Sequence, residues 1–198
     1  MKLKNSYFGM RHGEGFATVQ GIIISDPECG TFKKYPLTVV GRWQVKHSIM
    51  RAKKMGLLGP SPRIYSSPFS RCAEAAEIVR EVLGIKEKIL LDTRLRERWF
   101  GSLDQTRVEN YRQVWRLDRW DSYHKTFGVE SPGEVENRMR DFVMGCERDH
   151  VGETFLLVSH GDPLQILATA LHGILPGFHR KLPELGLAEI RELVLTRS

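Results

Sequence analysis

The chain of 198 residues has few cysteines and no long apolar run. Its three cysteines, Cys29, Cys72 and Cys146, form no CxxC pair, which argues against a zinc ribbon or a redox motif. No stretch approaches the roughly 18 consecutive apolar residues of a membrane helix. The N-terminal MKLKNSYFGM is too short and too polar for the apolar core of a signal peptide. We therefore expect a cytoplasmic protein with reduced thiols and no membrane partner.

Long runs of basic residues are also missing, although the net charge is +6. The clusters KLK at 2–4 and KK at 33–34 and 53–54 are short. Proteins that bind nucleic acid usually gather lysine and arginine on one continuous surface, so we expect no nucleic-acid partner. A small phosphorylated substrate is still compatible with the charge, because a few well-placed arginines suffice to bind a phosphoryl group.

Short apolar runs alternate with helical patterns along most of the chain. Strands are expected at 6–10, 63–68, 88–93 and 154–160, and helices at 38–56, 69–84, 131–149 and 163–173. Thr38 suits the N-cap of the first helix, and Gly84 the end of the second. This alternation predicts an α/β sandwich with a largely parallel sheet.

Three parts of the chain have weaker patterns. Residues 16–37 contain two glycines and two prolines and are expected to form a long loop. Residues 106–128 are rich in aromatic and charged side chains; they could be helical but do not resemble core. Residues 187–196 fit a last strand or a short helix equally well. In the helix at 38–56, the expected apolar side consists of Val39, Trp43, Val45 and Ile49.

Segments rich in arginine, histidine, serine and acidic residues follow the expected strands. MRHGE at 10–14, SSPFSR at 66–71 and VSHGD at 158–162 stand at strand ends, and LRERWFG at 95–101 follows the strand at 88–93. The carboxyl ends of parallel strands meet at one edge of a sheet, and ligands bind beyond that edge. We therefore expect these four segments to surround one site.

These four motifs, in this order, resemble the histidine phosphatase superfamily, which includes the cofactor-dependent phosphoglycerate mutases. YPLTVVGRWQ at 35–44 is similar to the family's segment that leads into its first helix. The resemblance implies a three-layer α/β/α sandwich and a phosphohistidine intermediate. It also leads us to expect a single histidine phosphatase domain over residues 1–198. The basic and aromatic content of residues 111–127 makes that region a candidate lid over the substrate, and we place the lid insertion at residues 103–132.

The resemblance implies a role for each motif residue. His12 would be the nucleophile, and Arg11 and Arg71 would bind the phosphoryl oxygens. His160 would be the second histidine of the pocket, with a part in catalysis and in phosphate binding. Glu97 would give a proton to the leaving group.

General physical chemistry is consistent with these roles. A histidine must be neutral to attack phosphorus, and surrounding cations, among them a protonated His160, favour the neutral form of His12. The backbone N–H of Gly161 at a helix start could bind the phosphate, and Gly13 could let the backbone approach it. A bound phosphoanion would raise the pKa of Glu97 and keep that group protonated as an acid.

Some residues keep alternative interpretations. Glu97 could instead form a loop salt bridge with Arg94, Arg96 or Arg98. Glu14 could contact the substrate, support the site from behind, or lie in a solvated turn. Asp162 could support His160 or cap a helix. No cluster of metal ligands is evident, and the scheme needs neither a metal ion nor a cofactor.

The chain lacks sequence features typical of the family's phosphoglycerate mutases. Phosphoglycerate mutases typically continue RHGES with a pattern like WN..N.F.GW.D, whereas this chain has RHGEGFATVQGIIISDPECG. They also tend to have tyrosine in ERHYG, where this chain has Phe100. These differences favour a metal-independent phosphatase of the histidine acid phosphatase type, with a phosphoglycerate mutase as the alternative.

Two further interpretations concern binding. A non-catalytic module that binds phosphoanions is the second alternative, although the complete set of motif residues argues against it. The aromatic and basic segment 111–127 indicates a phosphomonoester larger or more hydrophobic than phosphoglycerate. Nothing in the sequence sets an oligomeric state.

Overall fold

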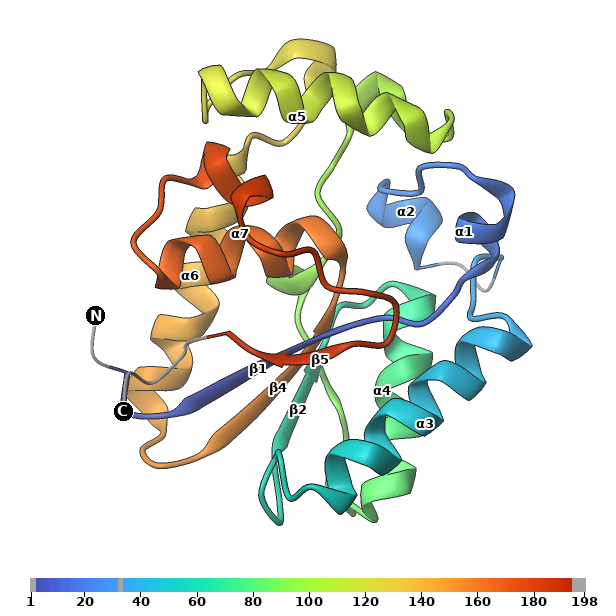
Figure 1. The fold of residues 1–198 in the computed structure, drawn as a ribbon, viewed down its shortest axis with the longest axis vertical. Helices are drawn as coiled ribbons and strands as arrows, with labels where there is room; N and C mark the ends of the chain where they lie inside the picture. Colours follow the sequence, from blue (N-terminus) through green and yellow to red (C-terminus); the bar gives the residue numbers. More distant parts are fainter. Residues whose placement is uncertain (1–2, 32–33, 194–198) are drawn as a thin grey trace.

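A sheet with one antiparallel edge strand forms the centre of the molecule (Figure 1). The computed structural model describes residues 3–31 and 34–193. Within these residues the sheet has five strands in the order β3-β2-β4-β1-β5. They are β1 (Ser6–Arg11), β2 (Arg63–Ser66), β3 (Leu90–Leu91), β4 (Thr154–Ser159) and β5 (Ile190–Glu192). Strands β1 to β4 all run parallel to one another, and only β5 is antiparallel, to β1. Within the described residues the sheet is therefore largely parallel, as expected.

Helices cover both faces of the sheet, which confirms the three-layer α/β/α arrangement. Figure 1 shows α3 (Val39–Lys54) and α4 (Ser70–Leu83) on one side and α6 (Pro132–Asp149) and α7 (Gly161–Leu171) on the other. Among the helices of residues 3–31 and 34–193, none has the length and apolarity that crossing a membrane would require.

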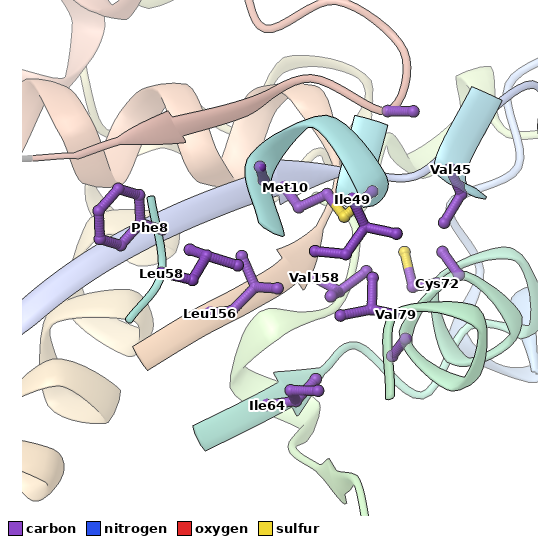
Figure 2. Packing of buried hydrophobic residues seen from close by; sticks show 14 of the residues in the cluster. Phe8, Met10, Val45, Ile49, Leu58, Ile64, Cys72, Val79, Leu156 and Val158 are labelled. Atoms are coloured by element: carbon purple, nitrogen blue, oxygen red, sulfur yellow. The ribbon is translucent and has the colours of Figure 1, made fainter. Parts of the chain in front are cut away.

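The alternation of side chains along each strand explains the two core layers. Phe8 and Met10 of β1 pack with residues of α3 and α4 in one cluster, part of which Figure 2 shows. Tyr7, which directly precedes Phe8, packs in the opposite cluster with Phe155 of β4 and residues of α6 and α7. Successive strand residues point to opposite faces, and both faces are covered here, so the strands read as continuous apolar runs.

The expected helix ends are confirmed. The Thr38 hydroxyl accepts a hydrogen bond from the Gly41 N–H at 3.0 Å and caps α3. Gly84 ends α4 with a φ of 75°, a left-handed conformation that favours glycine. Helix α6 begins with a capping box, in which Ser131 and Glu134 each bind the other's backbone N–H.

Two expectations about residues 16–56 are wrong. Residues 16–37 are not one long loop, because they contain α1 (Phe16–Gln20) and α2 (Pro27–Gly30). Helix α2 starts where the Asp26 side chain accepts from the Glu28 N–H and Pro27 takes the first helical position. The expected apolar side of α3 is also wrong: Val45 and Ile49 are buried, whereas Val39 and Trp43 are 78% and 59% exposed. Trp43 and Val45 are two positions apart, which places them about 200° apart around the helix.

The segment at 106–128 contains α5 (Tyr111–Trp120), between the 3₁₀ turns η3 (Val108–Asn110) and η4 (Thr126–Gly128). The expectation that it contributes no core is wrong. Val114 is fully buried in a separate apolar cluster with Ile23, Phe100 and Val129. The remaining 3₁₀ turns are η1 (Thr93–Leu95), η2 (Gly101–Leu103) and η5 (Pro176–Lys181). Of the expected last element at 187–196, β5 accounts for 190–192, and 194–196 lie outside the described residues.

The turn after β1 lies directly against the start of α3. A Cβ atom on Gly13 would lie 2.4 Å from the Gly41 carbonyl oxygen, and one on Gly41 would lie 2.0 Å from the Glu14 carbonyl oxygen. Only glycine fits at either position without a backbone shift. The turn that carries His12 is therefore fixed by backbone contact with a helix.

We expect Gly41→Ala to lower the free energy of unfolding by about 1–3 kcal/mol, because the new methyl group forces two backbones apart. Gly145→Ala in α6 is the matched control, since its Cβ would have no atom nearer than 3.7 Å. That control should stabilise the protein by roughly 0.5–1 kcal/mol through helix propensity. Urea unfolding of both variants measures the difference, and equal effects would contradict the proposed contact.

Candidate active site

A cavity of about 280 Å³ lies beyond the carboxyl ends of the parallel strands. Five residues singled out in the sequence line its wall: Arg11, His12, Arg71, Glu97 and Gly161. Arg11 ends β1, Arg71 lies in the first turn of α4 after β2, and Gly161 begins α7 after β4. The topology of the sheet therefore brings together residues as far apart in the sequence as Arg11 and Gly161.

His12 is held in one tautomer. Its Nδ1 lies 2.7 Å from the carbonyl oxygen of Gly13, which can only accept, so Nδ1 carries the proton. The Nε2 atom accepts a hydrogen bond from Arg71 Nε at 3.1 Å and therefore has its lone pair free of a proton. Burial, then Arg71 and Arg11, lower the pKa of His12 well below its usual value. The ring is therefore neutral at pH 7.

His160 lies behind Arg71 and is fully buried. Its Nδ1 accepts from Arg71 Nη2 at 3.0 Å, which leaves the proton on Nε2, 2.9 Å from the Ser67 hydroxyl oxygen. Burial and then the charges of Arg71 and other neighbours lower the pKa of His160 well below its usual value. His160 is thus neutral here, in contrast to the protonated form expected from the sequence, because it is fully buried and lies beside the positive charge of Arg71.

Two arginine nitrogens in this site have no acceptor among the described residues. Arg11 Nη1 donates to Glu184 Oε1 and to the Leu185 carbonyl, both at 2.9 Å, while its Nε is buried without a partner. Arg71 donates through Nε and Nη2, and its Nη1 is buried without a partner. Buried N–H donors without acceptors are rare and costly, so a site that leaves two of them is prepared for an anion.

Glu97 faces the same cations. Its Oε2 lies 3.6 Å from Arg71 Nη2 and 3.4 Å from His160 Nδ1, and its Oε1 accepts from the Arg98 N–H at 3.0 Å. Burial raises the pKa of Glu97 to about 7, with Arg71 opposing and Asp162 adding to the increase. The expected increase is therefore present without a bound anion, since burial is its main cause.

The alternative salt bridges of Glu97 are wrong. Arg94 pairs with Asp92 and Asp141, each at 2.7 Å, and Arg96 pairs with Glu130 at 2.8 Å. The side chain of Arg98 turns away from the cavity toward other carboxylates. Each neighbouring arginine thus has its own partner, and Glu97 is left to face the cavity.

Of the other expected site residues, Gly161 lines the cavity, whereas Gly13 and Glu14 do not. Gly161 is the first residue of α7, where backbone N–H groups lack partners within the helix. Gly13 does not line the cavity, and its close approach is to Gly41 rather than to a ligand. Glu14 accepts from the Thr38 hydroxyl at 2.6 Å, and its N–H donates to Gln44, which fixes the turn against α3.

A buried polar network behind the cavity was not expected from the sequence. Arg98 is fully buried and forms two hydrogen bonds with Asp118 of α5, at 2.6 and 2.7 Å. It also lies 3.4 Å from Asp162, which accepts from Trp115 Nε1 at 3.0 Å. His124 Nε2 lies 2.7 Å from Asp118 on the same network. These bonds join α5 to the segment of Glu97 and to the start of α7.

The rest of the cavity wall comes from one segment that the sequence did not indicate and from the segment expected to form a lid. Ala17, Thr18, Ile22 and Ile24 come from the segment that the sequence suggested to be a loop, and Tyr111 and Trp115 come from α5. The spacing of Tyr111 and Trp115, four residues apart on a basic helix, was the only available signal. No signal in the sequence indicated Glu184, because this residue reaches the site from an irregular segment between η5 and β5.

Over residues 3–31 and 34–193, no group of three or more His, Cys, Asp or Glu side chains is arranged to hold a metal ion.

Comparison with known proteins identifies the family. The model of the histidine phosphatase superfamily (branch 1) matches residues 8–198. A probable phosphoglycerate mutase GpmB of Yersinia enterocolitica is 31% identical over 152 residues, which cover 74% of this chain and 68% of the relative. A 2,3-bisphosphoglycerate-dependent phosphoglycerate mutase of Brucella anthropi is 26% identical over 175 residues, covering 84% and 81% of the two chains.

Solved structures share the fold. A mycobacterial glucosyl-3-phosphoglycerate phosphatase in complex with VO3 superposes with a TM-score of 0.77 at 23% identity, over 93% of this chain and 88% of that one. A phosphoserine phosphatase of Entamoeba histolytica in complex with 3-phosphoglyceric acid gives 0.71 at 20% identity, over 94% and 88%.

We expect Asp118→Ala to lower the free energy of unfolding by about 3–5 kcal/mol, because it leaves the buried Arg98 without its main partner. Asp141→Ala, which removes a 64% exposed carboxylate from Arg94, is the matched control and should cost less than about 1 kcal/mol. Thermal and urea unfolding report both. An equal loss of unfolding free energy in the two variants would show that the buried Arg98–Asp118 pair contributes no more to stability than an exposed ion pair.

Glu97 should also make stability depend on pH. Its carboxyl group has a pKa of about 7 when folded and an ordinary value of 4.5, so the folded state binds more protons between these values. The wild type should therefore lose stability relative to Glu97→Gln as the pH rises from 5 to 8, by on the order of 3 kcal/mol. A difference that stays constant with pH would contradict the raised pKa.

Proposed function

The chain belongs to the histidine phosphatase superfamily, and from that premise we propose that it hydrolyses phosphomonoesters through a phosphohistidine on His12. The observation that carries the proposal is the unprotonated Nε2 of His12 beside two buried arginine nitrogens without acceptors. A nucleophile with a free lone pair and donors for a phosphoryl group then share one wall of the cavity.

In the first step His12 Nε2 attacks phosphorus, and the ester P–O bond breaks. Arg71 releases its hydrogen bond to Nε2 and donates to the phosphoryl oxygens, together with Arg11 and the N–H of Gly161. Glu97 gives its proton to the departing oxygen, so that the product leaves as a neutral alcohol. His160 contributes by accepting from Arg71 Nη2, which orients that guanidinium for the phosphoryl group.

In the second step water attacks the phosphohistidine. The Glu97 carboxylate takes a proton from this water, the P–N bond breaks, and His12 Nε2 regains its lone pair. Inorganic phosphate leaves, and Glu97 is again protonated. The two steps return every group to its starting state, and we propose that they need no metal ion, because the two arginines supply the positive charge.

A phosphatase is favoured over a mutase by the wall of the cavity. Phe100, in place of the tyrosine typical of mutases, is buried and lines the cavity with an apolar ring. A mutase must also keep its bisphosphate intermediate bound and exclude water from the phosphohistidine. The alternative retains support from curated relatives named phosphoglycerate mutases, and the experiment below decides between the two activities.

We further propose that residues 103–132 act as a lid within one domain that spans residues 1–198. Helix α5 of this segment lies above the carboxyl ends of the strands in Figure 1, and its Tyr111 and Trp115 line the cavity. A segment in this place could exclude water while the first step occurs.

The decisive experiment follows two products in the same tubes. The protein is incubated with EDTA and a panel of phosphomonoesters, including 3-phosphoglycerate with its bisphosphate primer. We expect inorganic phosphate to be released and no matching 2-phosphoglycerate to form. Isomer formation without phosphate would establish a mutase, activity that EDTA removes would contradict metal independence, and tight phosphate binding without turnover would support a binding module.

The same assay tests the nucleophile. His12→Ala should lose all measurable turnover, with an unfolding midpoint close to that of the wild type, because the fold does not depend on this ring. His47→Ala is the matched control, since His47 is an exposed histidine on α3 outside the cavity, and it should keep full activity. Near-normal turnover by His12→Ala would end the proposed mechanism.

A further inference from the structure

The cavity consists of two parts with different chemistry. The first part holds the ionisable groups described above, with Arg11 and Arg71 as its cations. The second part is walled mainly by Ile22, Ile24, Phe100, Val108, Tyr111 and Trp115, with Ala17 and Thr18 beside them. Once a phosphoryl group occupies the first part, the leaving group of the substrate must lie in the second.

From this division we propose that the substrate is a phosphomonoester with an uncharged, largely apolar leaving group of about the size of one aromatic ring. This inference rests on the proposed phosphatase activity of the same site and adds the class of substrate.

The distribution of charge supports an uncharged leaving group. Among the described residues that line the cavity, Arg11 and Arg71 are the only arginines or lysines. The other ionisable residues of the wall are Glu97, Asp162 and Glu184, which are acidic. A carboxylate on the leaving group would lose its water without gaining a cation, and burying an unpaired charge is costly.

One cation beside the aromatic wall, Arg180, is already engaged. Arg180 lies over the ring of Trp115, with its Cζ 3.9 Å from the ring centroid. Its Nη1 donates to Gln165 at 2.7 Å and its Nη2 to Glu184 at 2.8 Å. Arg180 is thus held by two acceptors and an aromatic face, and using it for a substrate carboxylate would break these contacts.

The aromatic part of the wall is already fixed in place. Trp115 donates through Nε1 to Asp162 at 3.0 Å, and Tyr111 stacks on it with ring centroids 5.3 Å apart. Phe100 meets Tyr111 edge to face at 4.6 Å. A preformed apolar wall does not have to be ordered when the ligand binds, which favours affinity for a flat apolar group.

The volume sets the size of the leaving group. An apolar cavity of about 150 Å³ is enough for benzene. The cavity of about 280 Å³ therefore has room for a phosphoryl group and one ring.

Three esters of primary alcohols test the proposal at similar intrinsic reactivity: benzyl phosphate, glycerol 3-phosphate and 3-phosphoglycerate. We expect kcat/KM for benzyl phosphate to exceed that for 3-phosphoglycerate by at least about 100-fold, with glycerol 3-phosphate between them. Equal or better turnover of 3-phosphoglycerate would overturn the inference and leave the phosphatase proposal intact. Absence of phosphate release from all three esters would instead count against the phosphatase itself.

A matched pair of variants tests the missing cation. Thr18 and Val19 are adjacent, exposed residues of α1, but only Thr18 lines the cavity. At about 150 mM salt, Thr18→Lys should raise kcat/KM for 3-phosphoglycerate about tenfold relative to benzyl phosphate. Val19→Lys should leave this ratio unchanged, because its charge is screened and lies outside the cavity. The same ratio in both variants, changed or unchanged, would show that the second part of the cavity does not select against charge.

Discussion

The rest of the site depends on the contacts that the guanidinium of Arg71 makes with His12, His160 and Glu97. This guanidinium is buried in the first turn of α4, donates to His12 and His160, and lies 3.6 Å from Glu97. Because a guanidinium only donates, each histidine nitrogen that faces it must carry a lone pair. The tautomers of both rings therefore follow from the position of one arginine. A cation at a helix start opposes the helix dipole, and this cost is reasonable where an anion is to be bound.

The position of Arg71 is itself a consequence of the topology. Parallel strands bring the ends of β1, β2 and β4 to one edge of the sheet, and each end leads directly into a functional segment. Backbone contact between Gly13 and Gly41 fixes the first of these segments, and the Arg98–Asp118 pair joins the segment of Glu97 to α5. The reacting groups thus lie on short turns with rigid neighbours, which keeps them close to their working geometry.

The sequence predicted those features that local patterns determine. The strands, the caps of α3 and α4, and the gathering of Arg11, His12, Arg71 and Glu97 follow from periodicity, capping residues and motifs at strand ends. The short helices α1 and α2 were missed, since four or five residues show no period. The part of the cavity wall from residues 17–24 and the bond between Arg98 and Asp118 were missed because they depend on tertiary packing, and no local pattern encodes that.

The protonation state of the site follows from a single physical cause. In water a glutamate is a far stronger acid than an imidazolium, so a proton shared between them would reside on the histidine. Burial disfavours every charged form, which raises the pKa of an acid and lowers that of a base. Here burial is the largest contribution to both shifts: the pKa of Glu97 rises to about 7, and that of His12 falls well below its usual value. The order of the two groups is reversed, and the proton resides on the carboxyl group while the imidazole keeps its lone pair. Burial of the two side chains therefore prepares an acid and a nucleophile together.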